Sequence, residues 1–474
     1  MNADLQQEWM QNYTFDELSI GQGATIRRKL TDADIAGFAA VSGDLNPTHL
    51  DEAYARDAGL RGKTAHGMWS GALVSTVLGT VFPGPGTVYV EQRMRFLGAA
   101  CAGDQLEISV HVKSMDRASA QITLDCVVRR HGGEDLMVGE AVVKAPARKQ
   151  RVPRSNGLRW HVFDAAAGVQ RLLDQANRHE RLRCAIVHPC DVDSLRGALD
   201  AARHGLFTPV IVAPRDRLLA VAQEAGLDLG STVIEDVPHS HAAAERAAAL
   251  AAMGEVQALM KGSLHTDELM KAVLSRPELR TKRRLSHVFR FDVPMYHKPL
   301  LVTDAAMNIA PTLEEKMHIV QNAIDLARVL GVETPKVAVL AAVEGVNSKM
   351  ACTLDAAALS KMADRGQITG GVLDGPLAFD NAVTDDVRDR LGPQTPGNGS
   401  AVAGHADVLV VPDLETGTML VQQLVSLADA DAAGIVLGAK VPIILTTGSD
   451  STLARLGSCA MAMLVDRHTR QRAR

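Results

Sequence analysis

The sequence is poor in aromatic residues and lacks the features that mark exported or membrane-spanning proteins. Phe, Tyr and Trp together make up only 3% of the 474 residues, so the cores must be built from Ala, Val, Leu, Ile and Met. No apolar run reaches membrane-spanning length without an interruption by charge, Gly or Pro. The N-terminus has neither the basic segment nor the apolar core of a signal peptide. We therefore expect a cytoplasmic protein with no membrane partner.

Cysteine is scarce, and the usual cofactor motifs are missing. The six cysteines are scattered without a C-x-x-C spacing, which favours reduced thiols over disulfides or a zinc site. Cys352 sits in an alanine-rich helical pattern, so a small buried residue is a better interpretation than a nucleophile. Neither a P-loop nor a dinucleotide fingerprint occurs, and the net charge of -5 gives no reason to expect a nucleic-acid partner. We expect no metal and no bound cofactor.

The length requires at least two domains, and the composition shows where they divide. A chain of 474 residues is too long for one ordinary core. Residues 147–159 are basic, contain Pro153 and have no apolar period, as expected of a linker. We therefore predict domains at 1–146 and 160–474, each able to fold and dimerise on its own.

A short loop in the first domain carries a carboxylate and an imidazole. Asp44 and His49 lie five residues apart, in a segment made stiff by Pro47. Such a pair can add or remove water by general acid–base catalysis. Taken alone, this spacing favours the simpler interpretation of a turn-capping Asp44 and a solvated His49.

A second feature follows the loop in the sequence. Gly67 opens an apolar segment, Met68–Phe82, that reads as a buried helix. A glycine at a helix start leaves its N–H free and allows close approach of a carbonyl oxygen. Four strand-like runs with turn residues between them follow and predict an antiparallel meander: Thr87–Phe96, Gln105–Ser114, Ala120–Arg130 and Leu136–Val143.

The pattern S-G-D-L-N-P-T-H-L-D…A-H-G-M resembles the MaoC-like, R-specific enoyl-CoA hydratases over about residues 12–146. The resemblance implies an α+β hot-dog domain, a curved antiparallel sheet wrapped around one long helix. It implies that Asp44 and His49 are the catalytic pair and that the Gly67 N–H polarises the thioester carbonyl. It further implies that Ser75 supports the active-site hydrogen bonds, with Asn46 and His66 contacting the substrate.

From about residue 160 onwards, strand-like and helical segments alternate. This alternation predicts an α/β domain with a mainly parallel sheet covered by helices. Between a strand ending at Met260 and a helix over Asp267–Leu274 lies a turn containing Lys261 and Gly262. Such a turn before a helix N-terminus suits an anion, although a simple strand-to-helix turn is an equally good interpretation.

Residues 160–465 resemble the phosphate acetyl- and butyryltransferases, in segments that run in order along the domain, such as Leu301–Asn308, Leu373–Ala382 and Gly434–Leu445. The resemblance implies a phosphate acyltransferase domain of two α/β subdomains with the active site between them, and usually a dimer. The implied reaction converts acyl-CoA and phosphate to acyl phosphate and CoA.

The segment after the last predicted strand departs from this family. The family commonly has Ser-Arg there and then an Asp, whereas this chain reads Thr447-Gly448-Ser449-Asp450. The resemblance implies catalytic roles for Thr447 and Asp450, and phosphate binding by Ser449 together with Lys261 and Gly262. Gly448 cannot supply the bidentate clamp of an arginine.

Two hypotheses follow. In the first, the chain is a bifunctional acyl-CoA enzyme, a hydratase joined to a phosphate acyltransferase, with CoA thioesters and phosphate or acyl phosphate as its substrates. In the second, the hydratase is active and the C-terminal domain has lost its chemistry, acting as an acyl-CoA sensor or an oligomerisation platform. In both, we expect a homodimer or a higher homo-oligomer.

Overall fold

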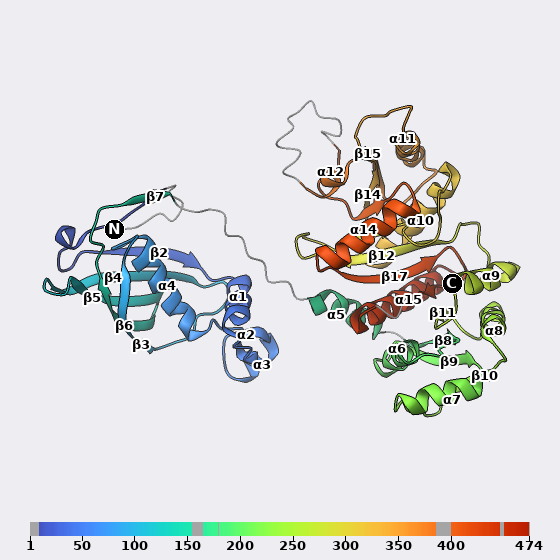
Figure 1. Ribbon diagram of the computed structural model, residues 1–474, viewed down its shortest axis with the longest axis horizontal. Coiled ribbons are helices and arrows are strands. Elements are labelled where there is room, and N and C mark those ends of the chain that lie inside the picture. The colour runs from blue at the N-terminus through green and yellow to red at the C-terminus, as the bar shows by residue number, and fades with distance from the viewer. Residues whose placement is uncertain (1–8, 154–164, 179, 385–399, 446–449, 474) are drawn as a thin grey trace. The chain divides into compact units, whose positions relative to one another are not determined.

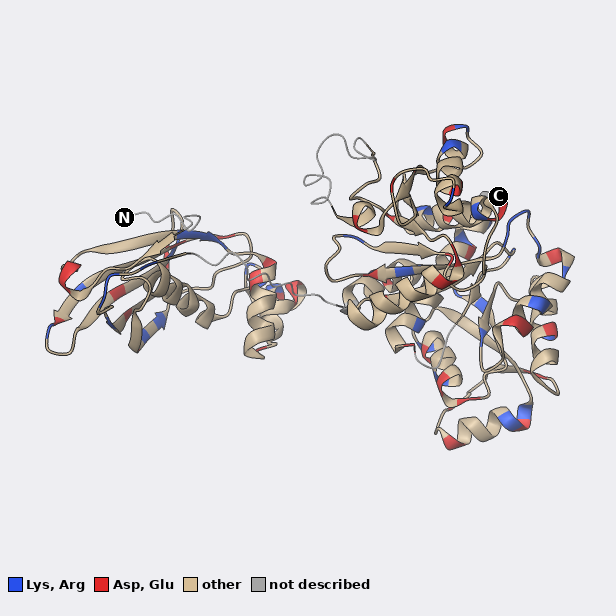
Figure 2. Cartoon of the chain, turned by 45° about the horizontal axis from the view of Figure 1, so that its top comes forward, with Lys and Arg blue, Asp and Glu red and all other residues tan. Residues whose placement is uncertain are grey.

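The structure is a computed structural model that describes residues 9–153, 165–178, 180–384, 400–445 and 450–473. The chain divides into two compact units, Met1–Val162 and Phe163–Arg474 (Figure 1). Within the described ranges, no helix has both the length and the apolar character needed to cross a membrane. Basic and acidic residues are interspersed over both units (Figure 2).

The first unit is built on a five-stranded antiparallel sheet with the strand order β2-β4-β5-β6-β3. The strands are β2 (Gly23–Lys29), β3 (Val88–Phe96), β4 (Gln105–Asp116), β5 (Gln121–Arg130) and β6 (Asp135–Lys144). Alternate residues of β4 and β5, such as Ile108 and Leu124, are buried, and they share one core with Leu73 and Val77 of helix α4 (Gly67–Thr80). The predicted hot-dog fold is confirmed.

Three short helices precede α4: α1 (Asp32–Ser42), α2 (Pro47–Leu50) and α3 (Glu52–Asp57). Thr31 caps α1, because its hydroxyl accepts a hydrogen bond from the Asp34 N–H and its own N–H donates to the Asp34 carboxylate. A 3-10 turn, η1 (Phe15–Glu17), lies before β2.

The two ends of the described part of this unit are joined by residues 9–12 and 148–153, which we call the strap. Strand β1 (Trp9–Gln11) pairs antiparallel with β7 (Arg151–Pro153). The fully buried Asn12 donates through its amide to the carbonyls of Pro85 at 3.0 Å and Arg148 at 2.9 Å, and accepts from the Gln150 N–H at 2.8 Å.

We predicted a linker over residues 147–159. In the structure, residues 148–153 of this range belong to the first unit. The strap is held by backbone pairing and one side-chain amide, so it has no apolar period that sequence analysis could detect.

We expect the strap to contribute measurably to stability. A fragment of residues 1–146 removes Arg148 and Gln150, and so leaves two of the three hydrogen bonds of buried Asn12 unmade. Its free energy of unfolding should fall by about 1–3 kcal/mol relative to a fragment of residues 1–153. Urea denaturation of both fragments measures the difference.

The control for this prediction is Asn12→Ala in both fragments. Because the variant no longer has an amide to leave unsatisfied, truncation should cost less in that background. An equal cost in both backgrounds would contradict the role of Asn12, and aggregation of both 1–153 and 154–474 would contradict independent folding.

The second unit contains an eleven-stranded sheet with the order β10-β9-β8-β11-β18-β17-β12-β13-β16-β14-β15. Its strands are β8 (Leu182–Val187), β9 (Phe207–Ala213), β10 (Val233–Asp236), β11 (Ala258–Lys261), β12 (Ser286–Asp292), β13 (Leu300–Thr303), β14 (Lys336–Leu340), β15 (Val372–Leu377), β16 (Val408–Val410), β17 (Asp431–Leu437) and β18 (Ile443–Ile444).

The sheet consists of two parallel blocks, which correspond to the two predicted subdomains. Strands β10, β9, β8, β11 and β18 form one block, and β13, β16, β14 and β15 form the other. Strands β17 and β12 join the blocks through antiparallel pairings on both sides. Most residues of β8, β12 and β13 are buried, as expected of strands covered on both faces.

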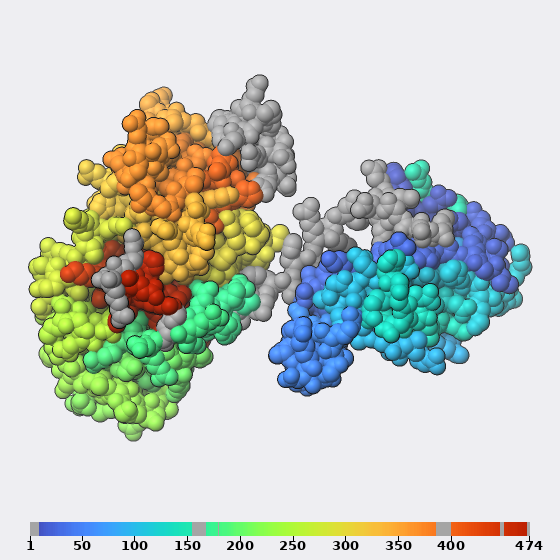
Figure 3. Space-filling view, turned by 180° about the vertical axis from the view of Figure 1, so that it is seen from behind, coloured from blue at the N-terminus to red at the C-terminus, as the bar shows by residue number. Residues whose placement is uncertain are grey.

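Helices cover this sheet: α5 (Ala165–Ala176), α6 (Val192–Arg203), α7 (Arg215–Glu224), α8 (Ser240–Ala252), α9 (Thr266–Ser275), α10 (Leu313–Val329), α11 (Ala351–Asp364), α12 (Phe379–Val383), α14 (Leu414–Leu427) and α15 (Thr452–Ala473), with a 3-10 turn η2 (Pro277–Leu279). Helix α15 buries Cys459 and Met461, and contacts α5, α6, α10 and β17. Seen from behind, it lies between the green and the yellow-to-orange segments of the unit (Figure 3). Helix α8 packs mainly through alanines, which agrees with the shortage of aromatic residues.

Candidate active sites

The loop after α1 is shaped by local hydrogen bonds. Gly43 ends α1 in the left-handed region, with φ of 74°, where a side chain would be strained. Asp44 accepts from the Asn46 N–H at 3.2 Å, and the Asn46 side chain accepts from the Thr48 N–H at 3.1 Å. Asn46 therefore acts as the N-cap of α2, with Pro47 in the first turn. Its predicted contact with substrate stays a prediction.

The structure brings Asp44 and His49 together. His49 Nδ1 lies 2.8 Å from the Thr64 carbonyl, and His49 Nε2 lies 4.0 Å from Asp44 Oδ2. Because a carbonyl can only accept, Nδ1 carries a proton, and in the neutral imidazole Nε2 is then the nitrogen with the lone pair, on the side of Asp44. The Asp44 side chain is 55% exposed and that of His49 13% exposed, so the pair is open to a ligand.

His66 lies beneath this pair rather than at the surface. It is only 3% exposed, its ring stacks on that of His49 with centroids 3.7 Å apart, and its Nε2 donates to the Asp44 carbonyl at 2.9 Å. Among the described residues, its Nδ1 has no hydrogen-bond partner. A buried ring does not fit the predicted contact with substrate.

Gly67 is the first residue of α4, where backbone N–H groups lack a partner within the helix. A Cβ at this position would lie 3.3 Å from the Phe96 ring, so the glycine keeps the helix start closely packed. Ser75 lies about two turns further along α4 and is exposed. Within the part of the chain that the structure describes, its hydroxyl shares no hydrogen bond with Asp44, His49 or His66.

Asp44, His49 and His66 also bring possible metal-ligand atoms within 4.8 Å of one another. The two imidazoles are stacked with an interplanar angle of 29°, so their in-plane lone pairs do not converge on one point. In addition, His66 Nε2 and His49 Nδ1 are engaged with carbonyls. This geometry suits proton transfer better than metal binding.

In the second unit, Lys261 ends β11 beside two carboxylates. Burial lowers the pKa of Lys261, while the charges of Asp191 and Asp450 act to raise it. Lys261 is therefore within reach of the charges of Asp450 and of Asp191, which the sequence analysis missed, and the role of this group in phosphate binding stays a prediction. Asp191 caps α6 by accepting from the Ser194 N–H at 2.8 Å. The predicted residues Thr447, Gly448 and Ser449 lie outside the described residues.

Gly262 serves the fold at this turn. A Cβ there would lie 2.6 Å from the carbonyl oxygens of Val187 and His188, and its N–H donates to the Val187 carbonyl at 2.9 Å. The backbone of β8 therefore leaves no room for a side chain. The Lys261 end is the carboxyl end of the parallel strands β8 and β11, where open α/β sheets usually bind ligands.

A cavity of about 450 Å³ lies near the opposite end of the β11–β18 pair, because Pro442 in its wall precedes β18. Arg283, Lys440 and His468 line it together with an apolar floor that includes Leu326 and Val465. The sequence analysis did not identify this cavity. The signal that could have found it is the run Arg280–Arg284, which contains four cations.

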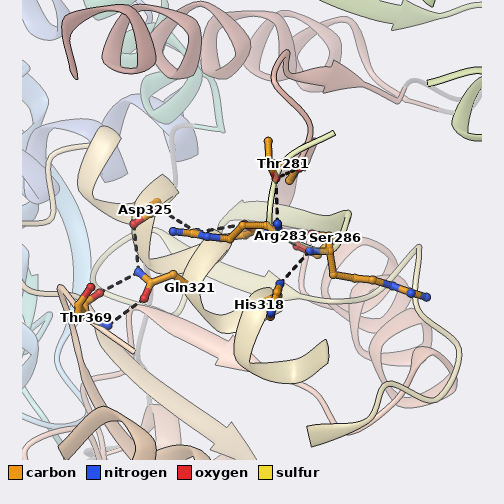
Figure 4. A network of polar contacts seen from close by, with 10 residues as sticks. Thr281, Arg283, Ser286, His318, Gln321, Asp325 and Thr369 are labelled. Carbon is orange, nitrogen blue, oxygen red and sulfur yellow. Dashed lines mark hydrogen bonds and ion pairs between the residues drawn. The ribbon is translucent and has the colours of Figure 1, made fainter. Parts of the chain in front are cut away.

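Arg283 is held in place by a polar network (Figure 4). Its Nη1 lies 2.8 Å from Asp325 Oδ2 and 3.3 Å from Asn322 Oδ1. Asn322 in turn donates to the Arg284 carbonyl and the Ser286 hydroxyl, both at 2.9 Å, and Gln321 connects Asp325 to the backbone of Thr369. The cavity therefore combines an apolar floor with one cation that is paired with the lining carboxylate of Asp325 and two further basic side chains, Lys440 and His468.

Comparison with known proteins agrees with both halves of this description. The family model for phosphate acetyl/butyryltransferases matches residues 239–463, and that for the MaoC-like domain matches residues 19–129. A phosphate acetyltransferase of Rhizobium meliloti is 56% identical over 295 residues, covering 62% of this chain and 92% of the relative. A phosphate butyryltransferase of Clostridium acetobutylicum is 37% identical, covering 60% and 94%.

Two solved structures are similar as well. A branched-chain phosphotransacylase of Enterococcus faecalis V583 is 29% identical with a TM-score of 0.53, covering 60% of this chain and 99% of that one. An R-hydratase of Pseudomonas aeruginosa is 36% identical with a TM-score of 0.32, covering 33% and 99%. The α/β unit is a phosphotransacylase domain preceded by a MaoC-like hot-dog domain. The chain belongs to the phosphate acetyl/butyryltransferase family.

Proposed function

We propose that the chain is a bifunctional acyl-CoA enzyme. The first unit hydrates short-chain 2-enoyl-CoA to R-3-hydroxyacyl-CoA, or catalyses the reverse reaction, and the second transfers acyl groups between CoA and phosphate. The observation that carries the hydratase proposal is His49 Nε2 facing Asp44 Oδ2 at 4.0 Å, with Nδ1 held by the Thr64 carbonyl. Hydration of crotonyl-CoA by the fragment 1–153 tests it directly.

The spacing of the pair fits the addition of water. A separation of 4.0 Å is too long for a direct hydrogen bond and suits a water that both groups contact. The pair would take a proton from water as its oxygen bonds to C3 and pass that proton on to C2, so that Asp44 and His49 end in the protonation state in which they began. The Gly67 N–H would stabilise the negative charge on the thioester oxygen. The supporting role of Ser75 stays a prediction.

We also propose a homodimer. Strand β3 lies at the edge of the five-stranded sheet and exposes Val88, Val90 and Phe96. An exposed apolar edge strand is prone to pair with another chain, and soluble proteins usually cover such an edge. Sedimentation velocity of the fragment 1–153 and of the full chain tests this proposal, and a monomer in both would contradict it.

In the second unit, the transferase proposal places phosphate at the Lys261 and Asp450 end of the sheet. The sequence places Gly448 where the family commonly has an arginine. One charged donor at such a site is typically worth about 2–4 kcal/mol, or roughly 10²–10³ in rate. We therefore propose a transferase that is weak and has a high KM for phosphate.

Gly448→Arg should raise kcat/KM for phosphate by about tenfold or more, because it restores part of this charge stabilisation. The measurement is phosphate- or arsenate-dependent release of CoA from acetyl-CoA and butyryl-CoA. Gly448→Gln is the matched control, since it adds a long polar side chain without charge. Rapid wild-type turnover that the arginine does not improve would show that another cation already fills the role.

A second candidate function is favoured by Gly448 together with the Arg283 cavity. The C-terminal unit would then bind acyl-CoA as a sensor, or serve as an oligomerisation platform, without transferring acyl groups. Absence of turnover in both wild type and Gly448→Arg, combined with acyl-CoA binding by calorimetry, would favour this function over the transferase.

A further inference from the structure

We propose that His66 is the positioning residue of the hydration site: it fixes the positions of Asp44 and His49 relative to each other without touching the substrate. This inference rests on the proposed hydratase function of the same site. It differs from the role that sequence resemblance implies for His66, which is contact with the substrate.

Two contacts make His66 the common support of the site. Its Nε2 donates to the Asp44 carbonyl at 2.9 Å, which fixes the backbone that carries the catalytic carboxylate. Its ring stacks on His49 at 3.7 Å, which fixes the plane of the catalytic imidazole. It is also the N-cap residue of α4, directly before Gly67, although among the described residues its side chain makes no capping hydrogen bond. At 3% exposed, the ring has no surface left for a ligand.

The hydrogen bond determines which nitrogen of His66 carries its proton. The Asp44 carbonyl can only accept, so the proton is on Nε2 and Nδ1 is bare. The bare Nδ1 is buried and has no partner among the described residues, an arrangement that costs free energy and that a purely structural position would not need.

The two contacts can be separated by substitution. His66→Gln keeps an N–H donor for the Asp44 carbonyl and removes the ring, whereas His66→Phe keeps the ring and removes the donor. Each should lower kcat for crotonyl-CoA by about tenfold, and His66→Ala, which removes both contacts, by about 100-fold. KM should stay within about twofold in all three, because the substrate does not touch His66.

Phe38→Leu is the matched control, because the Phe38 ring lies 5.1 Å from that of His66 and, among the described residues, has no ring contact with His49. It should lower stability while leaving kcat within about twofold. A fall in kcat as large as that of His66→Gln would indicate general loosening of the core and would overturn the proposal. A rise in KM without a change in kcat in the His66 variants would also overturn it, in favour of substrate contact.

A second measurement does not depend on activity. Nitrogen-15 NMR of histidine-labelled protein should show His66 as the Nε2–H tautomer and His49 as the Nδ1–H tautomer. The opposite tautomer at His66 overturns the inference even if the variants fold poorly. If wild type does not hydrate crotonyl-CoA but both tautomers are as expected, the proposed function fails while the positioning geometry stands. If wild type hydrates crotonyl-CoA and the His66 variants do so equally well, the inference about His66 is wrong while the proposed function stands.

Discussion

Asp44→Asn and His49→Gln should each lower kcat for crotonyl-CoA hydration by about 100-fold or more, as expected when a general acid or base is lost. Asparagine can still accept a hydrogen bond but cannot take up a proton at neutral pH, and glutamine cannot replace the lone pair of His49 Nε2. Because both replacements are similar in size to the original side chains, KM and the folded structure should change little. Stopped assays over a range of crotonyl-CoA concentrations separate kcat from KM.

The control for this prediction is Asp51→Asn. Asp51 lies in the same segment and caps α3 by accepting from the Tyr54 N–H at 3.0 Å, a role that asparagine also fills. Its hydration rate should therefore equal that of wild type. Unchanged kcat in both Asp44→Asn and His49→Gln would rule out this pair as the acid–base group.

Gly67→Pro should lower kcat by roughly 10²–10³ relative to Gly67→Ala, the cost that is typical of losing one oxyanion donor. Compared with alanine, proline replaces the N–H by a ring carbon on the backbone nitrogen, and it is well tolerated at the first position of a helix. The residue before it, His66, has φ of -59° and ψ of 138°, a conformation that precedes proline without strain. The helix should therefore form in both variants.

The comparison with Gly67→Ala isolates the N–H, because alanine and proline both place a Cβ about 3.3 Å from the Phe96 ring. Circular dichroism and the urea midpoint of both variants check that α4 is intact. Equal kcat in the two variants would show that the thioester oxygen is bound by another donor.

Much of the fold could be predicted because its determinants are local or periodic. Thr31 and Gly43 mark the ends of α1 by cap chemistry that acts within a few residues. The alternation along β4 and β5 and the apolar run of α4 predict a sheet packed on one helix. In the same way, strand–helix alternation predicts the α/β unit, whereas the pairing of Asp44 with His49 is implied only by the longer motif around them.

The features that were missed depend on contacts between residues far apart in the sequence. Residues 148–153 looked like linker because the strap depends on Asn12, more than 130 positions away. Asp191 joins Lys261 only through the pairing of β8 with β11. The Arg283 cavity needs α10, α15 and the segment before β18 to meet.

The sequence by itself determined which chemical groups this protein carries and the two folds that present them. Only the tertiary structure decided what each group faces. His66 stands next to Gly67 in a motif that suggests substrate contact, yet packing of α4 against the sheet buries its ring under His49 and points its Nε2 at the Asp44 carbonyl. The reason is physical: burial and stacking are set by the summed packing of distant segments, which no local pattern of residues encodes.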